Sequence, residues 1–186
     1  ELELLHTIQL DRAGYEDGFD KDELLWIPVS EDGVSSWVLN EPDFTGFVPE
    51  PGDRAWYTSL PENAINYKEN SWIQSPCFDF EGMDRPMIQM DIMKSFIPNT
   101  NEAVLQYMDV ADQGWKTIGE SKRGIAWYNM QDLANKPGGS QVGWGLSVFN
   151  PDKEWVQAAH DLDQVAGKPG VTFRIALSST GAQGIG

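Results

Sequence analysis

Hydrophobic and polar residues alternate with a period of two along much of the chain. In VTFRIALSS, residues 171–179, Val, Phe, Ile and Leu alternate with polar or small residues after the turn sequence Lys-Pro-Gly at 168–170. The segment PMIQMDIM, residues 86–93, repeats the alternation. This spacing is typical of strands with one buried and one exposed face. We therefore predict strands over both segments.

A β-hairpin is predicted in the middle of the chain. The strand-like segments AVLQYMDV, residues 103–110, and WKTIG, residues 115–119, flank the polar sequence ADQG. A polar connection of about four residues between two such segments is common in hairpins. The segment GWGLSVF, residues 143–149, is a further strand candidate, and its glycines suggest a bulge or a close approach of two backbones.

The segment SWIQSPCFDFEG, residues 71–82, combines strand-forming residues with a strand breaker. Proline has no N–H to donate to a ladder, so it is tolerated only at strand edges or bulges. We predict a strand that begins at Trp72, is interrupted at Ser75-Pro76 and resumes with Phe78 and Phe80 on one face.

Helical signals are weak, because no segment keeps apolar residues at helical spacing and the chain contains 18 Gly and 11 Pro. Short helical turns are predicted near residues 132–134 or 163–166. Many short strands between Gly and Pro turns predict an all-β fold, an antiparallel β-sandwich of the jelly-roll type. We expect a single domain over residues 1–186, in which residues 1–36 supply N-terminal strands and an acidic loop.

Composition and charge narrow the classes of partner. A chain of 186 residues with 40% hydrophobic residues can bury one sizeable core. Its 29 acidic and 13 basic residues give a net charge of −16, which argues against nucleic acid as a partner. No apolar run approaches the roughly 20 residues that span a bilayer, so we predict no membrane insertion. The single Cys77 excludes an internal disulfide.

No motif of a known catalytic site is present, and we predict that the chain is not an enzyme. His6 and His160 are the only imidazoles, and neither lies in a catalytic motif. The interpretation of His160 is a structural histidine bonded to local backbone. Jelly-roll glycosidases use two carboxylates across a cleft, but an acidic chain offers such pairs by chance.

Eight tryptophans make carbohydrate binding worth considering, because aromatic rings stack on the apolar faces of sugars. Trp127, Tyr128 and Trp144 border the longest irregular region, where binding groups tend to lie, and are the predicted ligand-binding residues. Burial in the core is the alternative for each. The tryptophans in strand-like positions are interpreted as core residues: Trp56, Trp72, Trp115 and Trp155.

Three stretches of the chain resemble a known family in their order. They are GDRAWYTSL at 52–60, SPCFD at 75–79, and HDLDQVAG at 160–167. From about Trp37 onward the chain resembles the MAM-like or concanavalin-like jelly-roll modules of secreted, gliding-motility-associated surface proteins of the Bacteroidetes, many of them exported by the type IX secretion system. The resemblance implies a secreted or cell-surface location and a role in adhesion.

Two departures from that family pattern affect the expectations. The hairpin keeps Trp115 of the family's Ser-x-Asp-x-Gly-x-Thr-Trp box but lacks its first Gly and its Thr. The family also continues into a closing strand, whereas this sequence stops at GAQGIG. We therefore expect the jelly roll to lack its closing strand, which would leave an edge for a strand from a neighbouring chain or domain.

A calcium site is the predicted cofactor site. Calcium binds six to eight oxygens, and the densest acidic cluster is YEDGFDKDE, residues 15–23. The family often has an aromatic-Glu pair near its start, which Tyr15-Glu16 resembles. The predicted ligands are Glu16 and Asp17, with Asp20 and Glu102 as further candidates. The alternative is that all four are solvated loop charges.

The sequence thus predicts a non-catalytic surface or secreted module that binds a glycan or a protein through the loop from about Ile125 to Gly145. One alternative is a structural or assembly subunit completed by a partner's strand. Another is an accessory domain of a secreted hydrolase.

Overall fold

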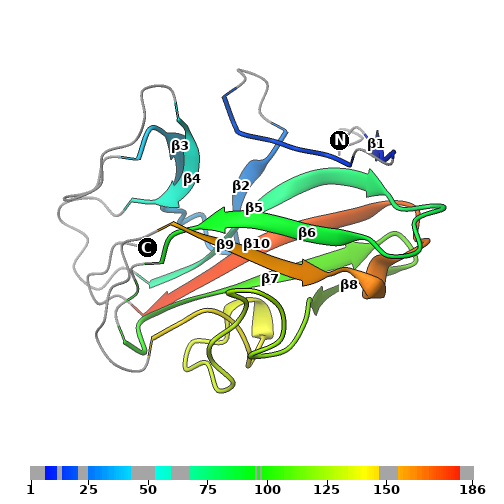
Figure 1. Cartoon of the computed structure of the whole chain (residues 1–186). Coiled ribbons are helices and arrows are strands. Elements are labelled where there is room, and N and C mark those ends of the chain that lie inside the picture. Colours follow the sequence, from blue (N-terminus) through cyan, green and yellow to red (C-terminus); the bar gives the residue numbers. More distant parts are fainter. Residues whose placement is uncertain are drawn as a thin grey trace.

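Figure 1 shows the computed structural model of the chain, which describes residues 7–11, 14–20, 25–42, 53–59, 68–94, 96, 98–146 and 155–180. The regular structure in these ranges consists of strands and two short 3₁₀ helices. The strands are β1 (Thr7–Gln9), β2 (Ile27–Ser30), β3 (Trp37–Asn40), β4 (Ala55–Thr58), β5 (Lys68–Asp79), β6 (Met87–Ile92), β7 (Asn101–Asp109), β8 (Asp112–Thr117), β9 (Val156–Asp161) and β10 (Val171–Thr180), and the 3₁₀ helices are η1 (Pro137–Gly139) and η2 (Asp163–Val165).

The strands pair in a nested order. The main sheet has the order β1-β5-β10-β7-β8, with β2 also paired to β5, and two smaller sheets are formed by β3–β4 and β6–β9. The antiparallel pairs β5–β10, β6–β9 and β7–β8 therefore enclose one another along the chain. This winding is that of a jelly roll. The predicted all-β antiparallel sandwich is confirmed, with β1 as a parallel exception beside β5.

The core lies between the main sheet and the β6–β9 sheet, which crosses in front of it in Figure 1. From the main sheet, Leu105, Val171 and Phe173 are buried, and from the second layer Ala158 of β9 is buried while Ile88 of β6 packs against the cluster. These residues occupy the apolar positions of the alternating segments. Burying each large apolar side chain contributes about 1.5–3 kcal/mol to stability.

The Ser75-Pro76 step in β5 is a β-bulge. Ile73 pairs with Ile175, and Phe78 pairs with Val171, with a register shift between these pairs. Residues 171 and 175 of β10 are four apart and lie on one face of the sheet. Residues 73 and 78 of β5 are five apart, so in a regular strand they would lie on opposite faces. One extra residue between them brings Ile73 and Phe78 to the same face. The Ser75 hydroxyl accepts the Phe173 N–H at 2.9 Å and donates to the Pro76 carbonyl at 2.7 Å. The bulge thus keeps Phe78 in the core.

The hairpin is tighter than its sequence suggested. β7 ends at Asp109 and β8 begins at Asp112, so the connection contains two residues instead of about four. The Asp109 carboxylate accepts the backbone N–H groups of Ala111 and Asp112 at 3.0 and 2.8 Å, which satisfies the donors of a short turn. The predicted loop length was therefore wrong, although the hairpin itself is confirmed.

The remaining local predictions have mixed outcomes. The helical turn near residues 163–166 is confirmed as η2, whereas residues 132–134 form bends and no helix. In the strand predicted over 143–149, Gly143 and Trp144 form isolated bridges with Met130 and Ala103, and residues 147–149 lie outside the described ranges.

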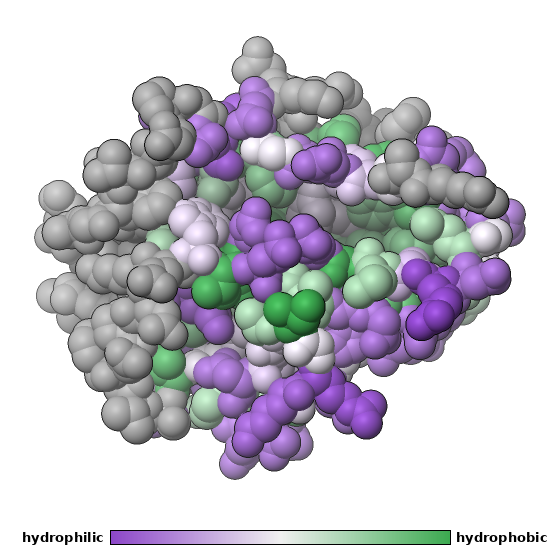
Figure 2. Space-filling model, viewed as in Figure 1, coloured by the Kyte–Doolittle hydropathy of each residue, from purple (hydrophilic) through white to green (hydrophobic). Residues whose placement is uncertain are grey.

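Both edges of β10 are paired, with β5 on one side and β7 on the other. Residues 181–186 lie outside the described part of the chain, so the expectation that the jelly roll lacks its closing strand stays a prediction. In the described ranges, no helix is long and apolar enough to cross a bilayer. On the face seen in Figure 2, hydrophilic residues predominate and hydrophobic ones form small groups between them.

Candidate functional site

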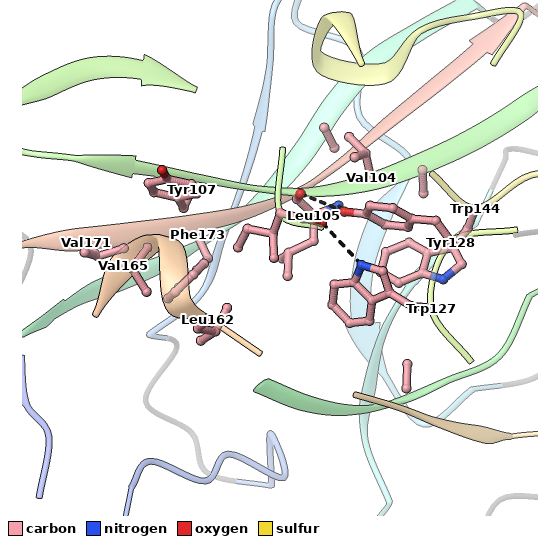
Figure 3. Close-up of a cluster of buried hydrophobic side chains, with 14 of the residues drawn as sticks. Val104, Leu105, Tyr107, Trp127, Tyr128, Trp144, Leu162, Val165, Val171 and Phe173 are labelled. Atoms are coloured by element: carbon pink, nitrogen blue, oxygen red, sulfur yellow. Dashed lines mark hydrogen bonds between the residues drawn. The ribbon is translucent and has the colours of Figure 1, made fainter. Parts of the chain in front are cut away.

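The three aromatic residues predicted to bind ligand are buried. Trp127, Tyr128 and Trp144 are 4%, 1% and 3% exposed, and their ring centroids lie 4.8–5.3 Å from one another. The three rings pack together in the core cluster shown in Figure 3. The expectation that they line a binding surface is therefore corrected, because no ligand can stack on them in this structure.

These rings are buried because they complete one edge of β7. The Tyr128 hydroxyl accepts the Leu105 N–H at 3.1 Å and donates to the Leu105 carbonyl at 2.9 Å, as Figure 3 shows. The Trp127 indole N–H donates to the Ile118 carbonyl at 3.2 Å, and Trp144 pairs with Ala103 further along the same edge. The irregular segment thus continues the ladder where β8 ends. Burial raises the pKa of the Tyr128 hydroxyl.

His160 is part of the same packing. Its ring is 8% exposed, lies 4.9 Å from the Trp127 ring and has its Nδ1 2.6 Å from the Asp161 carbonyl oxygen. Because a carbonyl can only accept, Nδ1 is the protonated nitrogen of the ring. The interpretation of His160 as a structural histidine bonded to local backbone is confirmed. His6 lies outside the described residues.

The predicted calcium ligands are not gathered into a cluster. Glu16 is exposed, whereas the Asp17 carboxylate accepts the Tyr15 hydroxyl at 2.6 Å and the Phe19 N–H at 2.8 Å. Asp20 is exposed. Glu102 is fully buried and bonds elsewhere. In the ranges that the structure describes, no group of three or more His, Cys, Asp or Glu side chains is placed to hold a metal. Calcium binding stays a prediction.

A different set of residues forms a built site on the polar face of β10. Arg174 pairs with Gln74 of β5 and with Gln106 of β7, so the three side chains share one face of the main sheet, which we call the outer face. Arg174 is only 6% exposed. Its Nε donates to the Gln106 amide oxygen at 2.9 Å, which fixes the direction of the guanidinium.

Two indole rings flank this guanidinium. Its central carbon lies 4.6 Å from the centroid of the Trp72 ring and 4.3 Å from that of Trp115. Trp72 belongs to β5 and Trp115 to β8, so the rings approach from opposite sides of β10. Each partly desolvated contact of this kind contributes about 0.5–2 kcal/mol. Arg174 is therefore held in place by contacts with both rings and by the bond to Gln106.

The loop around η1 covers one side of the site. The buried Glu102 carboxylate accepts the N–H groups of Ala134 and Asn135 at 2.9 and 2.6 Å, and Gln106 donates to the Gly138 carbonyl at 3.1 Å. Gly138 has φ +55°, and a Cβ there would collide with the Gln106 amide oxygen and lie 3.0 Å from Arg174 Nη2. Glycine thus allows the loop to approach the guanidinium.

Beside Arg174 lies a solvent-open pocket of about 240 Å³. Its charged lining residues are Arg174, Lys136 and Glu31. Asn70, Trp72, Asn135 and the backbone of Gly138 and Gly139 complete most of the wall. Two cations and one carboxylate thus line the pocket, in a chain whose net charge is −16.

Arg174 has no carboxylate partner in this pocket. Among the described residues, no acidic oxygen forms an ion pair with its guanidinium, and Glu31 acts on it only at longer range. Burial lowers the pKa of Arg174 to about 10, and the charge of Glu31 partly offsets this. At neutral pH the side chain is a desolvated cation, and a guanidinium has five N–H donors of which one is used by Gln106.

Sequence reasoning missed this site. Trp72 and Trp115 were interpreted as core residues, and Arg174 was placed only on the polar face of its strand. The one usable signal was an arginine at the centre of a strand in a strongly acidic chain. Its two aromatic neighbours lie on other strands, and strand order and register bring them together.

Comparisons with known proteins give little beyond the chain's own features. No family model and no curated protein matches the sequence. Among solved structures, the crystal structure of the K1 cleaved adhesin domain of Lys-gingipain from Porphyromonas gingivalis W83 is similar, with a TM-score of 0.44 and 14% identity over 91% of this chain and 95% of that chain. The resemblance to MAM-like modules stays a prediction.

Proposed function

We propose that the chain is a non-catalytic binding module that recognises a glycan in the pocket beside Arg174. The observation that carries this proposal is Arg174, a residue only 6% exposed whose guanidinium is flanked by two indole rings and lines an open pocket. A preorganised polar group of this kind stabilises binding because little entropy is lost when the ligand arrives.

The chemistry of the lining favours a sugar over an apolar ligand. Most small-molecule pockets are lined by apolar side chains, whereas this pocket is lined by amide, ammonium, guanidinium and carboxylate groups. Such groups pair with the many hydroxyls of a saccharide, and the partly exposed Trp72 in the pocket wall offers apolar contact to a sugar ring.

A binding role fits the pocket better than a catalytic one. Glycoside hydrolysis uses two carboxylates on opposite sides of the bond, and Glu31 is the one carboxylate among the lining residues. His160, the imidazole that the structure describes, is occupied by the Asp161 carbonyl and the Trp127 ring. We place the module outside the cell, as the sequence resemblance implies.

Tryptophan fluorescence provides the test, since Trp72 lines the pocket and Trp115 contacts the Arg174 guanidinium beside it. The chain is titrated with a panel of neutral and acidic polysaccharides, and a saturable change that Arg174→Ala abolishes is the expected result. Trp155→Phe is the control, because Trp155 is 40% exposed and does not line the pocket. Binding that survives Arg174→Ala in a folded protein, or no binding by any glycan, would overturn the proposal.

A further inference from the structure

The Arg174 guanidinium is a cation that forms no ion pair with any of the described residues. Its Nε is bonded to Gln106, but no hydrogen bond from the two Nη groups to the described residues is present. Four N–H donors on a side chain that is 6% exposed are therefore available only from the direction of the pocket.

The flanking rings restrict what these donors can reach. Trp72 and Trp115 lie on two sides of the guanidinium, so polar partners must approach where the rings leave it open, from the pocket. An arginine with available Nη groups forms paired hydrogen bonds with a carboxylate that approaches in the plane of the guanidinium. Lys136 adds a second positive charge to the same pocket.

From these observations we infer that the pocket selects glycans that carry a carboxylate, with a uronic acid residue bound through its carboxylate to the Nη groups of Arg174. This inference rests on the proposed glycan-binding function and names the class of sugar. Glu31 remains at the rim, where its exposed carboxylate is screened by water and can accept hydrogen bonds from sugar hydroxyls.

The negative charge of the whole chain restricts the binding of anionic glycans to this pocket. A surplus of 16 negative charges repels polyanions in general, so a uronate is bound only where cations are concentrated. At physiological salt the screening length is about 8 Å, so distant acidic residues weaken the pocket's attraction little. Binding should therefore persist at physiological salt, unlike attraction of a polyanion to a basic surface.

The test compares matched ligands that differ only in charge. Oligomers of galacturonate, glucuronate and mannuronate are titrated calorimetrically into the full chain at 0.15 M salt, each beside its methyl ester. At least one of the acids should bind, and its methyl ester should bind with an affinity lower by about tenfold to hundredfold. This is the range expected for the loss of a charge-assisted pair of hydrogen bonds. Arg174→Lys keeps the positive charge but removes the paired N–H donors of the guanidinium. It should lower the affinity for that acid by about tenfold or more.

A further variant and further ligands distinguish failure of the uronate inference from failure of the glycan-binding function. Because Lys136 is exposed, Lys136→Met should lower the affinity for the acidic oligomer severalfold without changing the thermal unfolding temperature. If acid and ester bind equally well and both depend on Arg174, the glycan function stands and the uronate inference is overturned. If no acid binds but a neutral glycan binds through Arg174, the glycan function again stands and the uronate inference is again overturned. If an acidic peptide such as oligo-glutamate binds as tightly as every uronate, the pocket recognises carboxylates on protein, and both proposals fail.

Discussion

The Tyr128 hydroxyl allows a direct measurement of what the irregular segment does for the sheet. In Tyr128→Phe the ring is retained, but the buried Leu105 N–H loses its acceptor. The Leu105 carbonyl keeps a second bond, from the Ile118 N–H at 3.1 Å, so one backbone group is left unsatisfied. An unsatisfied buried donor costs about 1–3 kcal/mol, and the lost bond to the carbonyl adds about 0.5–1.5 kcal/mol. We expect a loss of about 2–3 kcal/mol.

Urea denaturation followed by tryptophan fluorescence measures this loss as a lower midpoint with an unchanged slope. In a chain of this size it corresponds to a fall in Tm of about 4–12 °C. Tyr107→Phe is the matched control, because its ring lies in the same core and its hydroxyl has no hydrogen bond to the described residues. We expect the control to change stability by less than about 0.5 kcal/mol. Equal effects of the two substitutions would refute the assignment of Tyr128 to the sheet edge.

Three further predictions follow from other contacts. Ser75→Ala should destabilise the fold by about 1–3 kcal/mol, because the buried Phe173 N–H loses its acceptor at the bulge; an unchanged urea midpoint would contradict this. The bond from Lys168, with support from backbone N–H groups, holds the pKa of Asp109 below its ordinary value of 3.8. Its contribution is therefore present above about pH 4 and lost as the pH falls through the depressed pKa, so Asp109→Asn should lower the urea midpoint at pH 7 and approach the wild type in acid. For calcium, the prediction is a rise in Tm with added metal that Glu16→Gln removes; a Tm that calcium leaves unchanged would eliminate the site.

Much of the fold could be predicted because its signals are local. The alternation in β6 and β10, the hairpin of β7 and β8, and the break at Ser75-Pro76 are each readable within about ten residues. Other features depend on partners distant in sequence. The parallel pairing of β1 with β5, for example, has no local signal. The two-residue turn is local, but its length is set by the Asp109 carboxylate, which accepts the N–H groups of Ala111 and Asp112.

The site was less predictable because it is assembled across strands. Trp72, Trp115 and Arg174 lie on β5, β8 and β10, and only the strand order places both rings against one guanidinium. Local reasoning placed aromatic residues in strands in the core and offered those in the loop as ligand-binding residues, with burial as the alternative. In this chain the outer face of the sheet keeps two indoles partly exposed, whereas the loop aromatics are buried.

The predicted binding segment, about Ile125 to Gly145, meets the proposed pocket only in its later part. Its aromatic first half continues the edge of β7 through Tyr128, and its later part brings Asn135 and Lys136 to the wall of the pocket. These two parts have different physical roles, since one satisfies buried backbone groups and the other presents polar groups to solvent. Substitutions in the first part should therefore change stability while leaving affinity intact, and substitutions at Lys136 should do the reverse. The irregularity of the segment is visible in the sequence, but which of its residues reach the proposed pocket depends on the side of the sheet that the segment crosses.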